Sequence, residues 1–213
     1  MDEMIKCAHC GAYFEQQPGI RQSVCTFCNF VMPRNVSDDK LKSERVLRDA
    51  MDGNAEAQYK VGLSYFNGKD GFDQDYKKAF EWFSKAYEQS NRDSLFYMGY
   101  LYSCGLGVEK DIMIGFDYYF KAHKIRPSYM PTVTNIGYNF EQLGNFKKTR
   151  KWYCKAAKEN HAHAQNNLGI LYREGRGVKR NIRKAIVWFT KAAEQGHEKA
   201  KGNLADALKK IQA

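Results

Sequence analysis

The stretch AHAQNNLGILYREGRGVKRNIRKAIVWFTKAAEQG, residues 162–196, decides the fold of this 213-residue chain. Apolar residues recur at spacings of three and four on both sides of its glycine-rich centre, residues 175–178. This spacing predicts two amphipathic helices joined by a short turn. The glycine-rich turn does not fit a phosphate-binding loop, because no strand precedes it and no Lys-Ser/Thr pair follows it.

The same two-part pattern occurs three more times upstream. Gly62, Gly99 and Gly137 take the position of Gly169, at spacings of 37, 38 and 32 residues. Each glycine is followed by a second segment rich in Trp, Tyr and Phe. A glycine in the first helix lets the second helix approach closely, and the large rings fill the volume beside that contact. The chain therefore predicts four stacked helical hairpins.

This pattern resembles the Sel-one-like repeat, a relative of the tetratricopeptide repeat. The match is strongest in residues 162–196, although Asn181 stands where the family signature has Asp. The second unit replaces the family's Lys-Ala with Ile114-Gly115, and the third lacks the glycine loop. The resemblance implies a mainly α fold, an α/α superhelical solenoid of stacked helical hairpins, with the four repeats in residues 55–197.

Two further helices are expected to cap the repeats. Residues 37–54 contain Ser37, a suitable N-cap, and end like the second helix of a repeat. Residues 198–213 repeat the spacing of a first helix, which predicts that four apolar residues face the core. These residues are Ala200, Leu204, Ala205 and Leu208.

Residues 1–36 contain two Cys-x-x-Cys pairs, Cys7 with Cys10 and Cys25 with Cys28. Four thiolates at this spacing can complete the tetrahedral shell of a zinc ion. The stretch resembles a zinc ribbon, with short strands near residues 11–14, 20–24 and 29–32. We therefore expect a small β domain that holds one structural Zn2+, because so short a segment cannot fold by burying apolar surface alone. Disulfides between the cysteines are the alternative.

Features of an enzyme are missing from the sequence. Four cysteines would close the zinc shell and leave no open position for a substrate. Cys104 and Cys154 are isolated from each other and are expected to be small buried residues. The histidines after residue 120 fall near the ends of second helices, where imidazole commonly stabilises the helix dipole. We expect no enzymatic activity and no small-molecule substrate.

The expected location is the cytoplasm. The first four residues include Asp2 and Glu3, where a secretory leader would be basic. No apolar run approaches the roughly 20 residues that cross a bilayer, so we expect no membrane contact. Paired thiols also favour a reducing compartment.

The resemblance implies that the first helix of each repeat lines a concave groove. Its side chains are aromatic toward the N-terminal end and more polar toward the C-terminal end, which is typical of partner recognition. The alternative is that neighbouring helices or the N-terminal domain cover these side chains. The predicted partner-binding residues are Tyr59, Phe66, Phe96, Tyr100, Tyr138, Asn166 and Arg173.

Positive charge is concentrated in the last third of the chain. Of the net charge of +10, residues 145–213 carry +12 from 17 Lys and Arg against five Asp and Glu, and the remainder carries −2. Eight of these cations fall at two equivalent repeat positions and define a predicted basic edge. Three interpretations stay open: a solvated surface, a site for an acidic protein, and a site for nucleic acid. The residues of the basic edge are Lys147, Lys148, Arg150, Lys151, Arg176, Lys179, Arg180 and Arg183.

These features predict a non-enzymatic protein–protein interaction module, an adaptor or scaffold that binds another protein through the groove of the repeats. Two alternatives remain. Small bacterial members of the Sel-one-like repeat family, which this chain resembles, include immunity proteins, so the chain could neutralise a cognate toxin or effector. It could also bind nucleic acid through the zinc ribbon and the basic edge.

Overall fold

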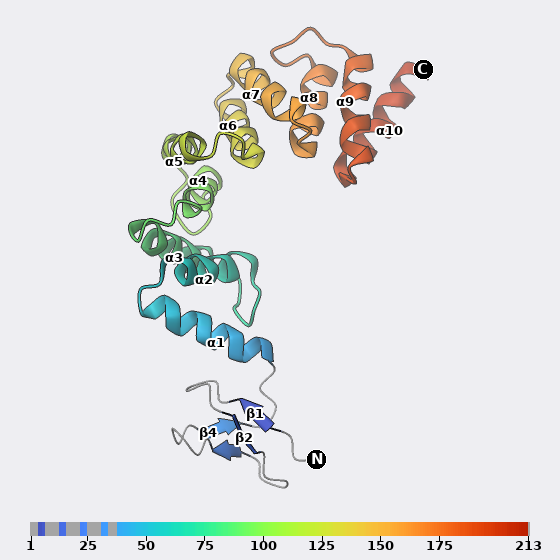
Figure 1. Cartoon of the computed structure of the whole chain (residues 1–213). Coiled ribbons are helices and arrows are strands. Elements are labelled where there is room, and N and C mark those ends of the chain that lie inside the picture. The colour runs from blue at the N-terminus through green and yellow to red at the C-terminus, as the bar shows by residue number, and fades with distance from the viewer. Residues whose placement is uncertain (1–3, 7–12, 16–21, 25–30, 34–37, 213) are drawn as a thin grey trace. The chain divides into compact units, whose positions relative to one another are not determined.

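The computed structural model describes residues 4–6, 13–15, 22–24, 31–33 and 38–212 (Figure 1). The chain forms two compact units, Met1–Asn91 and Arg92–Ala213. Most of the described chain is helical, and consecutive helices pack against each other within each unit. The predicted mainly α architecture of stacked helical hairpins is confirmed.

Two short hairpins begin the first unit. β1 (Met4–Lys6) pairs antiparallel with β2 (Tyr13–Glu15), and β3 (Gln22–Val24) pairs antiparallel with β4 (Val31–Pro33). β2, β3 and β4 lie close to the three predicted strands, whereas β1 was not predicted. The hairpins do not by themselves show a zinc ribbon, because Cys7, Cys10, Cys25 and Cys28 lie outside the described residues.

Three helices complete the first unit: α1 (Asp38–Met51), α2 (Ala55–Asn67) and α3 (Tyr76–Glu88). α1 packs against α2, where Ala50 joins Ala57 and Val61 in a buried cluster. The predicted N-cap Ser37 lies outside the described residues. α2 and α3 form the first repeat, and the Asp75 carboxylate begins α3 by accepting the backbone N–H of Lys78 at 3.0 Å.

Seven helices are described in the second unit, and they pack in consecutive pairs. They are α4 (Ser94–Cys104), α5 (Ile112–Ile125), α6 (Met130–Gln142), α7 (Phe146–Lys158), α8 (Ala162–Glu174), α9 (Ile182–Glu194) and α10 (Glu198–Gln212). Polar side chains define where α5, α7 and α9 begin, because Asp111, Asn145 and Asn181 each accept a backbone N–H of the first turn.

The glycine of each first helix contacts the ring of its paired second helix, as the sequence predicts. A Cβ added at Gly99 would lie 2.9 Å from the Tyr119 ring, and one added at Gly169 would lie 2.5 Å from the Phe189 ring. A methyl group cannot fit at either distance without moving the ring. These glycines therefore set the spacing between the paired helices.

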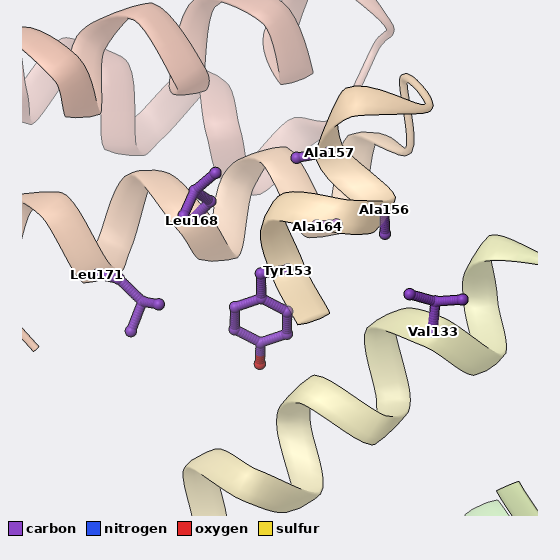
Figure 2. Close-up of a cluster of buried hydrophobic side chains, with 7 residues drawn as sticks. All are labelled: Val133, Tyr153, Ala156, Ala157, Ala164, Leu168 and Leu171. Atoms are coloured by element: carbon purple, nitrogen blue, oxygen red, sulfur yellow. The ribbon is translucent and has the colours of Figure 1, made fainter. Parts of the chain in front are cut away.

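One buried cluster joins α6, α7 and α8 (Figure 2). Tyr153 of α7 is fully buried between the two first helices, and the cluster includes Val133 from α6 and Leu168 and Leu171 from α8. Small residues on α7 and α8 let the backbones approach. Stacking of one repeat on the next is thus driven by apolar burial.

The expected core residues of α10 are only partly correct. Ala200 is buried, but Leu208 is 45% exposed and Ala205 is exposed, whereas Ala207 is fully buried against Ala185 and Phe189. Leu208 and Ala205 correspond to positions that the second helix covers in the repeats. α10 packs against α9 through the face that carries Ala200, Leu204 and Ala207, and the described chain has no second helix after α10 to cover Ala205 and Leu208.

Candidate functional site

The predicted partner-binding residues of the second unit all lie on first helices. Phe96 and Tyr100 of α4 are half-buried, and Tyr138 of α6 is 40% exposed. Asn166 is buried and Arg173 is half-buried on α8. Tyr138 is therefore the most accessible of the five. We use the term A-helix face for the surface of α4, α6 and α8 that carries these five residues.

Phe96 is held within an aromatic cluster. Its ring meets Tyr129 edge-on at 5.5 Å between centroids and Tyr97 at 5.2 Å, and it lies 5.9 Å from Tyr119. Such contacts contribute to folding beyond the area that they bury. Phe96 thus supports the A-helix face, and Tyr138 is better placed to contact a partner.

Tyr138 lies near the Glu141 carboxylate, which accepts a hydrogen bond from the buried Tyr153. The Tyr153 hydroxyl donates to Oε2 of Glu141 at 2.7 Å, and burial followed by the Glu141 charge raises the pKa of Tyr153. Burial also raises the pKa of Tyr138, with smaller contributions from Cys104 and Glu141. Both phenols therefore stay protonated at neutral pH and can donate hydrogen bonds.

α10 engages the C-terminal end of the A-helix face. Asn203 donates to Oδ1 of Asn166 at 2.9 Å and accepts from the Arg173 guanidinium at 2.8 Å. These contacts use groups that the sequence analysis assigned to a partner. Continuing the spacing of the first helices into α10 aligns Asn203 with Asn167, but this alignment does not indicate the two hydrogen bonds.

In the first unit, Tyr59 and Phe66 are half-buried on α2 and pack around the buried Phe83 of α3. The ring centroids lie 5.9 Å and 6.4 Å from that of Phe83, and Phe66 also meets Tyr76 edge-on at 5.5 Å. These rings contribute to packing within the first repeat and present only part of their surface.

The first unit also contains a cavity of about 410 Å³ that the sequence did not predict. It lies between α1, α2 and the loop that follows α2, with Val46, Leu63 and Phe72 among its apolar lining. At its rim Asp70 adopts a positive φ of 56°, and its carboxylate accepts from the Ser64 hydroxyl at 2.9 Å. The signal in the sequence was the length of this loop, because the stretch from Gly68 to the cap Asp75 is one residue longer than the equivalent stretch from Gly175 to Asn181.

The two clusters of the basic edge lie next to each other. The loop between α8 and α9 packs on the start of α7: the Arg176 guanidinium lies 5.6 Å from the Phe146 ring centre, and a Cβ added at Gly177 would be 2.6 Å from the Phe146 carbonyl oxygen. The eight cations are all exposed. The loop that carries Arg176 therefore contacts the first turn of α7, which carries Lys147 and Lys148.

Three histidines gather where α8 and α10 begin. His197 Nε2 lies 3.1 Å from His163 Nδ1, and His197 Nδ1 accepts the backbone N–H of Ala200 at 3.2 Å. The proton of neutral His197 is therefore on Nε2. His161 Nδ1 lies 2.9 Å from the Thr134 hydroxyl. Burial, followed by the neighbouring imidazoles, lowers the pKa of His161 and of His197.

No cluster of three His, Cys, Asp or Glu side chains within the described part of the chain could hold a metal ion. The zinc ligands predicted from the sequence lie outside that part. Cys104 and Cys154 are half-buried free thiols, and burial raises the pKa of each, so both are poor nucleophiles at neutral pH.

The Sel1 repeat family model matches this chain in four segments, residues 55–91, 92–122, 137–161 and 162–197. These segments cover more than half of the chain and fall within the four helical hairpins, although the third begins inside α6. The chain therefore belongs to the Sel1 repeat family.

Among curated proteins, the chain is 32% identical over 131 residues to the ERAD-associated E3 ubiquitin-protein ligase component HRD3B of Arabidopsis thaliana. That match covers 62% of this chain and 15% of the plant protein. The related component HRD3A of the same plant is 41% identical over 58 residues, covering 27% of this chain and 9% of HRD3A. The chain thus spans a small part of these relatives.

Two solved structures share the fold. A Sel1 repeat protein from Oxalobacter formigenes has a TM-score of 0.67 at 26% identity, covering 81% of this chain and 68% of that one. The protective antigen c5321 of uropathogenic Escherichia coli has a TM-score of 0.63 at 30% identity, covering 79% of this chain and 36% of that one. Among the helices described, none is both long and apolar enough to cross a membrane.

Proposed function

We propose that this chain is a non-enzymatic adaptor that binds a partner protein through its A-helix face. Proteins with Sel1 repeats mediate protein–protein interactions. The observation that carries the proposal is Tyr138 of α6, a large aromatic residue that is 40% exposed on the A-helix face, to which the half-buried Tyr100 of α4 also belongs. Accessible Tyr side chains bury much surface on binding while their hydroxyl groups form specific hydrogen bonds.

The surroundings of Tyr138 suit recognition. Ser103 of α4 accepts a hydrogen bond from Asn139 of α6 at 2.9 Å, which fixes the two first helices relative to each other. The Tyr153–Glu141 hydrogen bond orders the following turn of α6. A partner would therefore meet a rigid surface and lose little conformational entropy there.

The test is capture of partners from a lysate of the source organism by the wild-type chain, by the Tyr100→Ala/Tyr138→Ala variant and by Val187→Ala. Val187 is 53% exposed on α9 and serves as the matched control. We expect the double variant to lose the partners that the wild type and the control retain, with all three equally helical by circular dichroism. If all three proteins captured the same partners, the A-helix face would not be the binding surface, and the proposal would be wrong.

We also propose that the N-terminal cysteines bind one structural zinc ion. Lys6 of β1 lies opposite Tyr13 of β2, and Val24 of β3 lies opposite Val31 of β4, so the sequences between the paired strands are residues 7–12 and 25–30. Each begins with a Cys-x-x-Cys pair. Two hairpins of equal loop length are consistent with two matching zinc knuckles. The ion would supply folding free energy, and four thiolates favour a reducing compartment such as the cytosol.

Metal analysis tests this second proposal. Purified protein should contain about one zinc ion per chain, and Cys7→Ser/Cys10→Ser should contain much less. Cys104→Ser/Cys154→Ser is the matched control and should retain the metal, since these thiols are far apart in the sequence and not paired. Metal-free protein with all thiols titratable would contradict the proposal.

A further inference from the structure

The two clusters of the basic edge lie on segments of the chain that contact each other. Arg176 lies over the Phe146 ring, and Gly177 is packed so tightly on the Phe146 backbone that no side chain would fit. The loop that carries the second cluster therefore rests on the first turn of α7, which carries the first. The eight cations of these two contacting segments are all exposed.

This surface has little internal charge compensation. Within the described chain, Arg176 is the member of the basic edge that forms salt bridges, at 2.9 Å to Glu174 and 3.7 Å to Glu141. Arg180 donates to the backbone carbonyl of Arg173 at 3.1 Å. Lys151 and Arg183 form no ion pair with any described residue. The remaining positive field is available to an external anion.

Positive charge is concentrated at the N-terminal ends of α7 and α9, where the helix dipole favours negative charge. The first turns of α7 and α9 contain no acidic residue, and their caps are the neutral Asn145 and Asn181. The equivalent caps of α3 and α5 are Asp75 and Asp111. Cations at the positive end of a helix are unfavourable for folding. These cations therefore do not stabilise their own helices, and an anion bound beside them would offset the unfavourable charge.

The rings at the basic edge disfavour a single-stranded nucleic acid as the bound partner. Phe140 and Phe146 are half-buried, and cations lie above both: Lys148 Nζ is 5.0 Å from the Phe140 centre, and Arg176 lies over Phe146. Single-stranded nucleic acids bind strongly where bases stack on accessible rings. Covered rings leave ammonium and guanidinium groups as the contact atoms, which match carboxylates.

We propose that the basic edge binds an acidic segment, rich in Asp and Glu, of a partner polypeptide. The proposal rests on the protein-binding function proposed above and adds a second contact surface to it. The acidic segment would increase the association rate and orient the partner, while the A-helix face would bind its apolar residues.

The experiment uses the full chain and a fluorescent peptide of about ten glutamates, with single-stranded RNA and duplex DNA of about equal charge as competing probes. Fluorescence anisotropy gives the Kd at about 50 mM and about 200 mM salt. The test variant is Lys151→Gln/Arg183→Gln. The matched control is Lys209→Gln/Lys210→Gln, which removes the same charge from exposed positions of α10.

We expect the test variant to bind the peptide about three- to tenfold more weakly and the control to change by less than about twofold. Equal weakening by both variants, or no peptide binding at the lower salt, would overturn the proposal. Tighter binding of RNA or DNA than of the peptide would overturn it in favour of nucleic acid. Tyr100→Ala/Tyr138→Ala should keep the peptide affinity, so this result is independent of the A-helix face.

Discussion

The second and fourth repeats, α4–α5 and α8–α9, share their interior and differ at their surface. In both, a glycine of the first helix touches an aromatic ring of the second: Gly99 with Tyr119, and Gly169 with Phe189. Their exposed positions differ in charge, because Ile114 of α5 stands where α9 has Lys184. The comparison indicates that packing fixes the contact within each helix pair, whereas the charge of the exposed ends differs between repeats.

The surface difference has a structural counterpart. In the fourth repeat, Lys184 Nζ lies 5.6 Å from the Tyr172 ring centre. In the second repeat the equivalent Tyr102 stacks on Tyr118 at 5.7 Å instead, and Ile114 is 39% exposed. An aromatic pair thus replaces a cation–π contact. The fourth repeat acquires a cation, and the second acquires apolar exposure.

Removing the shared ring should have the largest effect. Phe189→Ala leaves a cavity in a fully buried site and should lower the free energy of unfolding by about 3–5 kcal/mol. Urea denaturation followed by tryptophan fluorescence measures it, and Val187→Ala is the control, expected to stay within about 0.5 kcal/mol. A small loss at Phe189 would mean that the helix pair does not depend on this contact.

Adding a methyl group on the other side of the contact should have a smaller effect. Gly169→Ala places a Cβ 2.5 Å from the Phe189 ring and should cost about 1–3 kcal/mol despite the better helix propensity of Ala. Gly202→Ala in α10 is the matched control, because no atom lies within 4 Å of its added Cβ. It should stabilise the protein by up to about 1 kcal/mol. Equal effects would show that helix propensity, rather than close approach, dominates.

The sequence correctly predicted the contacts that recur in all four repeats, but it did not predict the contacts of α10, where the repeat pattern ends. The Gly–ring contacts and the second helices followed from spacing alone, because the same physical requirement recurs four times. The role of Asn203 did not, because its hydrogen bonds join residues 30 and 37 positions away that have no equivalents in the earlier repeats. Leu208 is exposed, contrary to the prediction, because the described chain has no second helix after α10 to cover that position.

Acid should loosen the fourth repeat before the second. The pKa values of His161 and His197 are lowered by burial and by His163, while Lys199 lowers and Glu198 raises that of His197. The pKa of each histidine is thus lower in the folded protein than the value of about 6.5 in the unfolded chain. Its contribution to the free energy of unfolding is therefore fully present above about pH 6.5, and it is lost as the pH falls through the pKa of the folded protein. Protonating His197 Nδ1 also removes the hydrogen bond to the Ala200 N–H.

Amide hydrogen exchange at pH 7 and pH 5, corrected for intrinsic rates, measures this effect. Protection at the starts of α8 and α10 should fall at pH 5, whereas the start of α4, which contains no histidine, should keep its protection. The His161→Gln/His197→Asn variant should lose the difference between the two pH values. Uniform loss of protection in α4 and α8 would contradict a local histidine effect.

The smallest expected effect comes from a substitution at the cap of α9, which should change the free energy of unfolding and the affinity for the glutamate peptide in opposite directions. Asn181→Asp keeps the cap of α9 and adds a negative charge beside the helix dipole, so it should stabilise the protein by about 0.3–1 kcal/mol. The same charge should weaken binding of the glutamate peptide, because it offsets Arg183. Asp111→Asn in α5 is the matched reverse change: it should destabilise slightly and leave peptide binding unchanged. An Asn181→Asp variant that is more stable and also binds the peptide more tightly would contradict the prediction. The neutral caps of α7 and α9 would then be unrelated to an acidic partner. The difference between the second and fourth repeats would affect folding alone.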